Sequence, residues 1–514
     1  MNGKKEFGDY QTPTEFADKV CNYLQKNKAL KPDIVIEPTC GVGHFLQSSL
    51  VFNAEKYIGI EINPEYCAIC TQTFQDKPVE IINADLFSFP LSSLKKENKS
   101  ILLIGNPPWV TNGMLSSIGS GNLPEKNNFK GLRGVEAITG ASNFDICEYF
   151  ILQMIREFQN TNAIIAMLCK TSVARNIFSE IIRTKTNYNT CDILEFDSKS
   201  VFGISASACV LVIQLSSAMK STNTCKVFSL DNPSVCIDEI KYINGHLISC
   251  QVIGCTDYSG KCCFEWRQGV KHDCSSVMEL TKTKDGFSNG LGECVYIEDT
   301  ILFPLIKSSM FKTPIIHDFS KYVIVTQKKP RDNTAIIAEI APKTWSYLNR
   351  HRDFFDERKS SIYFGAPPFS MFGVGDYSFA KYKVGLSGFY KKPLFCLLYS
   401  SDAKPVMTDD TGYFIGFDDY ELAYVAMLIL NSNKVQQFIL CSAFLDAKRP
   451  FTKKLLNRID FSKIKDDISY SSLQETEKNL GIAPYVTNEM YLNFIDCLEM
   501  GQQTFPLEYL LNYG

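Results

Sequence analysis

The chain has 514 residues, a hydrophobic content of 45% and a formal net charge of −3 at pH 7. This length allows two or more domains with sizeable cores. The charge excludes a protein that attracts a polyanion through a global basic field, so any nucleic-acid site must be a local patch. No apolar stretch approaches the ~18 residues of a membrane-spanning helix, so we expect no membrane partner.

The 19 cysteines are scattered through the chain, mostly within apolar or strand-like segments. The N-terminal sequence MNGKKEFGDY lacks the apolar core of a signal peptide. Both features favour reduced thiols in a cytoplasm over a disulfide framework. Neither the pair Cys67 and Cys70 nor the looser group of cysteines between 250 and 274 has zinc-site spacing, so we predict no metal.

The first predicted element is a helix that begins near residue 12. Threonine suits the N-cap, proline the first helical position and glutamate the third, as found in Thr12-Pro13-Thr14-Glu15. A helix N-terminus beside the Thr12 hydroxyl suits an anionic ligand group, such as a carboxylate.

Three short apolar strands then alternate with helical patterns. The strands are predicted over residues 34–36, 57–60 and 79–82, and acids follow them at Glu37, Glu61 and Asp85. This alternation predicts a parallel α/β sheet, whose ligands bind at the carboxyl ends of the strands. Gly41 and Gly43 permit close approach of a ligand to the turn after the first strand. Because Leu46 replaces the third glycine of a dinucleotide fingerprint, we expect a cofactor without a pyrophosphate.

A fourth strand, residues 101–104, leads into Asn106-Pro107-Pro108-Trp109. The prolines cannot continue a β-ladder, because they lack an N–H group and have a fixed φ. The strand therefore ends there and presents an amide, backbone carbonyls and an indole ring. Each of these groups can bind a planar base that carries an amino group.

The segments EPTCGVGHFL, GIEINP, NADLF and GNPPW occur in this order. They resemble the motifs of the S-adenosylmethionine-dependent DNA amino-methyltransferases whose cofactor motifs precede the catalytic motif (the gamma order). The YQTP segment resembles the extra N-terminal cofactor motif of that group. The resemblance covers about residues 6–215. It implies a Rossmann-like class I methyltransferase sheet with an N-terminal helical extension, S-adenosylmethionine as cofactor and a prokaryotic source.

The resemblance also implies a role for individual cofactor residues. Thr12 would contact the methionine carboxylate, while Glu37 and the Cys40–Gly43 turn would surround the methionine and the ribose. Glu61 would bind the ribose hydroxyls, and Asp85 would bind the adenine amine. An apolar side chain after Asp85 would pack on the adenine ring. The complete predicted set is Tyr10, Thr12, Glu37, Thr39, Cys40, Gly41, Gly43, Glu61, Ile62, Asp85, Leu86, Phe87 and Asn106.

By the same resemblance, the catalytic residues would be Asn106, Pro107, Pro108 and Trp109. The Asn106 side-chain oxygen and the Pro107 carbonyl would accept the two N–H bonds of an exocyclic amine and direct its lone pair at the methyl group. Positioning and electrostatics would then supply the catalysis without a titratable base. The base must leave the duplex to reach this site. Trp109 would stack on one face of the base and Phe202 on the other.

Residues 110–143 are rich in Gly, Ser and Asn, which predicts a mobile loop beside the active site. Its basic residues Lys126, Lys130 and Arg133 would meet DNA phosphates. We expect a helix from residue 144 and strands over 163–168, 191–196 and 208–215, the last of which closes the sheet. The catalytic domain is therefore predicted to be residues 1–215.

Residues 216–514 are predicted to form a mixed α/β target-recognition region, with helices over 419–442 and 486–498. The segment 264–273 resembles the Arg-x-Gly-x-Lys segment that opens recognition domains in related enzymes. Basic residues interleave with aromatic ones in this region, as expected for a surface that holds phosphates and reads bases. The predicted DNA contacts are Arg267, Lys271, Lys328, Lys329 and Arg331.

Together these features predict a sequence-specific adenine-N6 DNA methyltransferase of the restriction-modification or orphan type. We expect a monomer whose partners are double-stranded DNA and a separate cognate restriction endonuclease. Three alternatives stay open: a cytosine-N4 DNA methyltransferase, a methyltransferase of ribosomal RNA or protein glutamine, and a catalytically silent DNA-binding subunit. The large C-terminal region argues against a small fixed substrate, and the intact motifs argue against a silent subunit.

Overall fold

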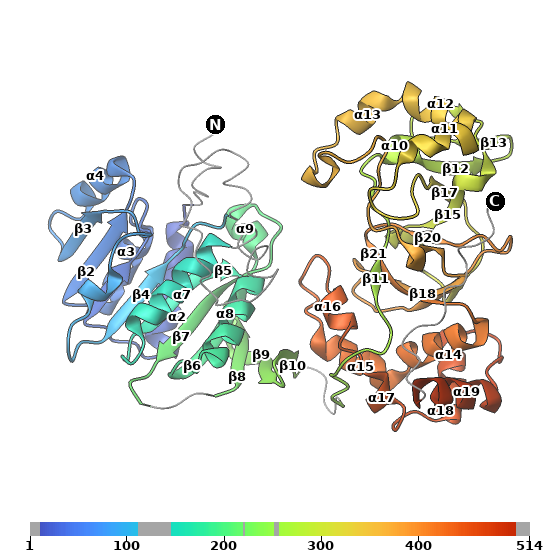
Figure 1. Ribbon diagram of the computed structural model, residues 1–514. Helices are drawn as coiled ribbons and strands as arrows, with labels where there is room; N and C mark the ends of the chain where they lie inside the picture. Colours follow the sequence, from blue (N-terminus) through green and yellow to red (C-terminus); the bar gives the residue numbers. More distant parts are fainter. Residues whose placement is uncertain (1–10, 111–144, 219–221, 251–255, 500–514) are drawn as a thin grey trace. The chain divides into compact units, whose positions relative to one another are not determined.

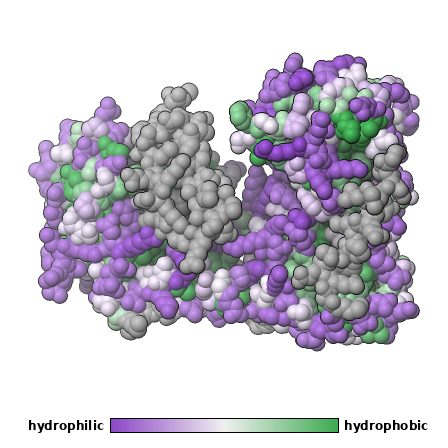
Figure 2. All heavy atoms as spheres, viewed as in Figure 1, coloured by the Kyte–Doolittle hydropathy of each residue, from purple (hydrophilic) through white to green (hydrophobic). Residues whose placement is uncertain are grey.

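The computed structural model describes residues 11–110, 145–218, 222–250 and 256–499 (Figure 1). The chain divides into two compact units, Met1–Gln251 and Val252–Gly514. Several predicted positions lie outside the described residues: Tyr10, Lys126, Lys130, Arg133 and nearly all of the loop 110–143. The visible surface of each unit is mostly hydrophilic, with hydrophobic side chains in small clusters (Figure 2).

The first unit contains a ten-stranded sheet with the order β10-β9-β8-β6-β7-β5-β4-β1-β2-β3. Its strands β1 to β5 pair in parallel, and β7 runs antiparallel between β5 and β6. Every residue of β1 and β4 is buried, as expected for central parallel strands that helices cover on both faces. The strands are β1 (Ile34–Glu37), β2 (Lys56–Glu61), β3 (Val79–Asn83), β4 (Ile101–Gly105), β5 (Ile164–Lys170), β6 (Tyr188–Phe196), β7 (Ala208–Leu215), β8 (Thr224–Ser229), β9 (Asn232–Ile243) and β10 (His246–Ser249). The expected parallel α/β sheet is thus confirmed.

The helices of this unit are α2 (Thr14–Asn27), α3 (His44–Ser49), α4 (Pro64–Thr73), α7 (Ile146–Phe158), α8 (Thr171–Arg183) and α9 (Ser198–Phe202). Helices α7 and α8 lie together on one face of the sheet (Figure 1). The predicted start of α2 is wrong by one residue, since the first helical residue is Thr14 and not Pro13. Pro13 occupies the N-cap with ψ at 137° and no side-chain cap is formed, because the Thr12 side chain turns to the end of β4 instead.

The sheet does not close at β7, and the boundary expected at 215/216 is corrected to 251/252. Strand β8 pairs in parallel with β6 over Asp192–Glu195, and β9 and β10 extend the sheet by antiparallel pairing. Without β8, strand β6 would be an unpaired edge. The sequence hides this extension because β9 is mostly exposed or half-buried and carries no apolar run.

The second unit contains one sheet ordered β11-β21-β18-β19-β16 and another ordered β14-β13-β12-β17-β15-β20. The strands are β11 (Arg267–Gln268), β12 (Glu279–Thr283), β13 (Gly286–Ser288), β14 (Cys294–Val295), β15 (Leu302–Ile306), β16 (Ile315–Ile316), β17 (Lys321–Ile324), β18 (Tyr382–Ser387), β19 (Cys396–Leu398), β20 (Met407–Thr408) and β21 (Gly412–Phe417). The helices are α10 (Ser275–Met278), α11 (Ile337–Ile340), α12 (Pro342–Arg350), α13 (Arg352–Asp356), α14 (Tyr420–Asn431), α15 (Asn433–Ser442), α16 (Lys453–Leu456), α17 (Phe461–Ile464), α18 (Tyr470–Leu480) and α19 (Asn488–Glu499). The expected mixed α/β character is confirmed.

The long helix predicted over 419–442 is two helices, α14 and α15, because Ser432 adopts an extended conformation between them. Helix α14 is buried from Ala423 to Leu430 and forms part of the largest core of this unit. Within the part of the chain that the structure describes, no helix is long and apolar enough to cross a membrane.

Candidate active site

The ends of four neighbouring parallel strands form one edge of the first unit. Strands β4, β1, β2 and β3 are adjacent in the sheet, and each ends in one of the predicted polar residues or is closely followed by one. The edge therefore carries, in spatial order, Asn106, Glu37, Glu61 and Asp85. The sequence predicted this row, since parallel strands end on the same side of a sheet.

Glu37 is the buried acid of this edge, with 3% of its surface exposed. Its Oε2 atom accepts a hydrogen bond from the Leu46 backbone N–H at 2.9 Å. Burial, together with the nearby Cys70 and Glu61, raises the pKa of Glu37 well above its usual range. A carboxyl group in such a place is ready to ionise when a cationic ligand group pairs with it.

The turn between β1 and α3 forms a tight cradle beside Glu37. Gly41 and Gly43 have φ values of +52° and +84°, in the left-handed region that favours glycine. A Cβ atom at Gly43 would lie 2.7 Å from the Phe74 ring. The buried Oγ1 of Thr39 has no hydrogen-bond partner among the described residues. The turn thus offers backbone approach and a polar group to a ligand.

Glu61 is tied to this turn through both carboxylate oxygens. Oε2 accepts from the Gly41 N–H at 2.8 Å and Oε1 from the Asn63 N–H at 2.8 Å. Each carboxylate oxygen has a second lone pair, so further hydroxyl donors can still bind. Ile62, the next residue, is 42% exposed and presents an apolar side chain at the same edge.

Asp85 caps a short turn after β3, where its Oδ1 accepts from the Phe87 N–H at 2.9 Å. Leu86 is buried. The ring of Phe87 packs on α7, with its centroid 4.7 Å from that of Phe150 and 5.6 Å from that of Tyr149. Helix α7 therefore fixes the position of the Asp85 turn.

Asn106 is held by the N-terminal extension of the unit. Its Nδ2 donates to the Thr12 hydroxyl at 3.3 Å, and the Thr12 carbonyl oxygen lies 2.6 Å from His44 Nδ1. Thr12 thus connects Asn106 to the first residue of α3. Sequence reasoning missed His44, whose only signal is its place directly after the glycine turn.

Trp109 and Phe202 meet, as the predicted stacking pair requires, but in an edge-to-face contact. Their ring centroids are 5.8 Å apart at an interplanar angle of 66°. Phe16 of α2 lies 6.1 Å from Phe202. Trp109 is 8% exposed, and its buried Nε1 has no partner within the described ranges. A third planar ring can therefore fit between the two only when one of them rotates.

No family model matches this chain. A relative from Nostoc sp. PCC 7524, the type II methyltransferase M.NspV, is 42% identical over 467 residues, which cover 89% of this chain and 96% of that protein. The chain belongs to the type II methyltransferases. The modification methylase CviBIII of Paramecium bursaria Chlorella virus NC1A is 24% identical over 38% of this chain and 45% of its own length.

A solved structure of the type IIL restriction-modification enzyme MmeI in complex with DNA matches 98% of this chain and 80% of its own chain, at a TM-score of 0.53 and 12% identity. This type II methyltransferase thus has the class I methyltransferase sheet followed by a second unit, as expected. It is a sequence-specific DNA methyltransferase of the restriction-modification type.

S-adenosylmethionine is the cofactor of this type II methyltransferase, and when bound it supplies an electrophilic methyl group. The described residues fit it: Glu37 offers a buried acid, the Gly41 turn offers close backbone approach, and Thr39 Oγ1 is a buried polar atom without a partner among them. No group of three or more His, Cys, Asp or Glu side chains in the described ranges is placed to hold a metal ion.

Two of the predicted DNA contacts of the second unit, Arg267 and Lys329, meet at one short helix, Asp376–Phe379. The Arg267 guanidinium lies 4.4 Å from the centroid of the Tyr377 ring, and Lys329 Nζ lies 3.6 Å from Asp376. Arg267 also pairs with Glu265, and Lys271 pairs with Asp273 at 3.2 Å. Lys328 and Arg331 are exposed beside Lys329. Two basic segments that are far apart in the sequence therefore share one surface.

Proposed function

We propose that this type II methyltransferase transfers the methyl group of S-adenosylmethionine to the exocyclic N6 of an adenine flipped out of double-stranded DNA. The hydrogen bond from Asn106 to Thr12 carries this proposal. Because Thr12 takes the Nδ2 side of the amide, Oδ1 is the atom that would accept an N6–H bond. The side-chain orientation thus suits an amine substrate.

The proposed chemistry needs only positioned acceptors. Asn106 Oδ1 and the Pro107 carbonyl would each accept one N–H of the amine, which localises its lone pair on nitrogen. The N–C bond forms as the bond between the methyl carbon and sulfur breaks, and the surplus proton leaves the product nitrogen. Pro107 and Pro108 keep the chain extended at the strand end, and Trp109 would stack on the base.

The residues proposed to bind the cofactor lie at the carboxyl ends of the same strands. Glu37 would ionise to pair with the methionine ammonium group, and the Thr12 hydroxyl would contact the carboxylate. Ribose hydroxyls would donate to the remaining lone pairs of Glu61, and the adenine amine to Asp85. Ile62 is exposed where the adenine ring would pack. Thr39, Cys40, Gly41, Gly43, Leu86 and Phe87 would complete the cradle.

The second unit would read the target sequence through the surface around Arg267, Lys271, Lys328, Lys329 and Arg331. We further propose that the protein acts as a monomer in a prokaryotic cytoplasm and protects DNA from a separate endonuclease. Cytosine N4 is the second candidate acceptor, because the same two acceptors would bind its exocyclic amine.

The decisive experiment expresses the chain in a host that lacks DNA methylation. Modified positions are mapped by single-molecule sequencing, and the DNA is digested to nucleosides for mass spectrometry. We expect N6-methyladenine within one short sequence motif, and no modification with the variant Asn106→Ala. N4-methylcytosine would instead establish the second candidate, and unmodified DNA would refute both.

A further inference from the structure

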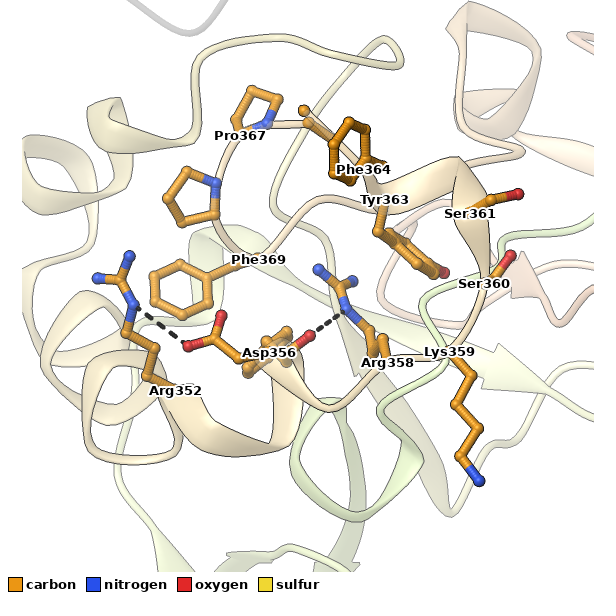
Figure 3. Close-up of a pocket in the computed structure, with 14 residues that line it drawn as sticks. Arg352, Asp356, Arg358, Lys359, Ser360, Ser361, Tyr363, Phe364, Pro367 and Phe369 are labelled. Carbon is orange, nitrogen blue, oxygen red and sulfur yellow. Dashed lines mark hydrogen bonds and ion pairs between the residues drawn. The ribbon is translucent and has the colours of Figure 1, made fainter. Parts of the chain in front are cut away.

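A loop of the second unit carries a solvent-exposed aromatic ring at its tip. The loop spans residues 357–369, directly after α13, and its tip residue Phe364 is 90% exposed. No other large hydrophobic side chain of the described residues is as exposed. Figure 3 shows that Phe364 lies away from the buried ring of Phe369.

The first half of this loop is fixed by Arg358. Its Nη1 donates to the carbonyl oxygens of Ser370 at 2.6 Å and His272 at 3.2 Å, and its Nε donates to that of Phe355 at 3.0 Å. The guanidinium also lies 3.7 Å from the centroid of the Tyr363 ring. Tyr363, the residue before Phe364, is therefore stacked on the Arg358 guanidinium, which its own hydrogen bonds hold in place.

The second half is fixed by the residues after the tip. The Thr334 hydroxyl donates to the Pro368 carbonyl at 2.6 Å. Phe369 is 1% exposed and packs edge-on against Phe355 and Trp345, at centroid distances of 4.9 and 5.4 Å. Gly365 supplies the tight turn with a φ of +66°. Phe364 is thus exposed because the residues on both sides of it are held by hydrogen bonds and ring contacts.

The loop borders a hollow of about 440 Å³ whose lining contains cations and hydroxyl groups. Its lining includes the exposed cations Arg352 and Lys359 and the hydroxyls of Ser360 and Ser361. Arg352 is held by Asp356, 3.9 Å away on the next helical turn. Cations and hydroxyls can bind the phosphates of a nucleic acid, and an exposed aromatic ring beside them can stack on its bases.

We propose that Phe364 is a wedge that inserts between base pairs of the target duplex while Arg352 and Lys359 contact the flanking phosphates. The proposal rests on the proposed DNA-modifying function. Apolar side chains on DNA-binding surfaces insert between base steps and unstack them, and a ring that refills the stack stabilises the distorted duplex. Preorganisation of the loop lowers the entropy lost on insertion.

The test uses the full chain and a duplex that contains the motif found by sequencing. The variants are Phe364→Ala, Phe364→Trp and the control Tyr296→Ala, which removes another exposed aromatic ring (73% exposed) from the same unit. Two quantities are measured: kcat/KM for methylation, and the fluorescence of 2-aminopurine placed in turn at each position of the site. Thermal unfolding checks that each variant folds.

We expect Phe364→Ala to lower kcat/KM about ten- to a hundredfold, because one base–aromatic stack is lost. Phe364→Trp and Tyr296→Ala should stay within about threefold of the unchanged chain. The fluorescence at one base step should rise on binding of the unchanged chain and stay low with Phe364→Ala.

The wedge proposal would be wrong if Phe364→Ala had the same kcat/KM as the unchanged chain. It would also be wrong if Tyr296→Ala lowered kcat/KM as much as Phe364→Ala does. If Phe364→Ala kept its kcat/KM but lost binding to a second protein, the Phe364 ring would be a contact for a protein partner, and the wedge proposal would be wrong. Failure of the unchanged chain to methylate any DNA would refute the proposed function itself, which separates the two outcomes.

Discussion

Asn106 donates its side-chain N–H to the hydroxyl of Thr12, a residue 94 positions earlier, across 3.3 Å. This contact orients the amide at the end of β4, and in the proposed reaction Oδ1 would be the acceptor for the substrate amine. It also ties the N-terminal extension to this strand end, and the same Thr12 contacts His44 through its carbonyl oxygen.

The first prediction concerns this contact. Asn106→Ala removes an acceptor that acts in the transition state and should lower the single-turnover methylation rate by about a hundred- to a thousandfold or more. Thr12→Val keeps the packing but removes the hydroxyl, and should lower the rate about tenfold, as expected for one hydrogen bond. Calorimetric titration should show that Asn106→Ala binds S-adenosylmethionine within a fewfold of the unchanged protein. Full activity of Thr12→Val would show that Thr12 does not position the amide.

The second prediction concerns the pH dependence of stability from Glu37. Its pKa is raised by burial in the folded state, so the folded state binds more protons than the unfolded state above pH ~4.5. The stability of the unliganded protein should therefore fall as the pH rises from the unfolded pKa toward the folded pKa. Glu37→Gln stays neutral, so its melting temperature should exceed that of the unchanged protein by a margin that grows with pH.

Calorimetric melts between pH 5 and 9 measure this margin. Glu97→Gln is the control, because Glu97 is exposed and the substitution should produce no such trend. A margin that is constant over the whole range would contradict a raised pKa at Glu37.

The third prediction separates backbone strain from crowding at the cofactor turn. Gly43 and Gly245 have nearly the same φ, +84° and +83°, but a Cβ atom at Gly43 would meet the Phe74 ring at 2.7 Å, whereas one at Gly245 meets open space. Gly245→Ala should destabilise the protein by only the strain of the left-handed conformation, about 1–2 kcal/mol. Gly43→Ala should destabilise it more and also weaken S-adenosylmethionine binding. Equal unfolding free energies for the two variants in urea would contradict the crowding at Gly43.

The fourth prediction tests the boundary of the first unit. A fragment of residues 1–251 should fold and bind S-adenosylmethionine, because it keeps the complete sheet. A fragment of residues 1–215 lacks β8 and exposes the edge of β6, so it should aggregate or unfold. Size-exclusion chromatography and circular dichroism of both fragments provide the measurement. A folded, monomeric 1–215 fragment would show that β8 to β10 are dispensable.

The sequence predicted the row of strand ends well because its signals are local. Each strand is a short apolar run that ends in a residue unable to continue it or in a polar one, as at Glu37-Pro38 and Asn106-Pro107. Parallel strands must end on one side of the sheet, so the row of polar side chains follows from the order of these segments. The N-terminal helix was placed one residue early, because the Thr12 side chain bonds to the distant Asn106 and does not cap the helix.

The sequence by itself determined the fold class, the strand ends and the row of polar groups along the cofactor edge, because hydrophobic periodicity and turn residues act over a few positions. Only the tertiary structure decided which distant residues meet. It joined Asn106 to Thr12, placed Trp109 edge-on against Phe202, extended the sheet through β8 to β10, and brought Arg267 and Lys329 to one short helix. These contacts depend on packing between segments far apart in the chain, which no local pattern encodes.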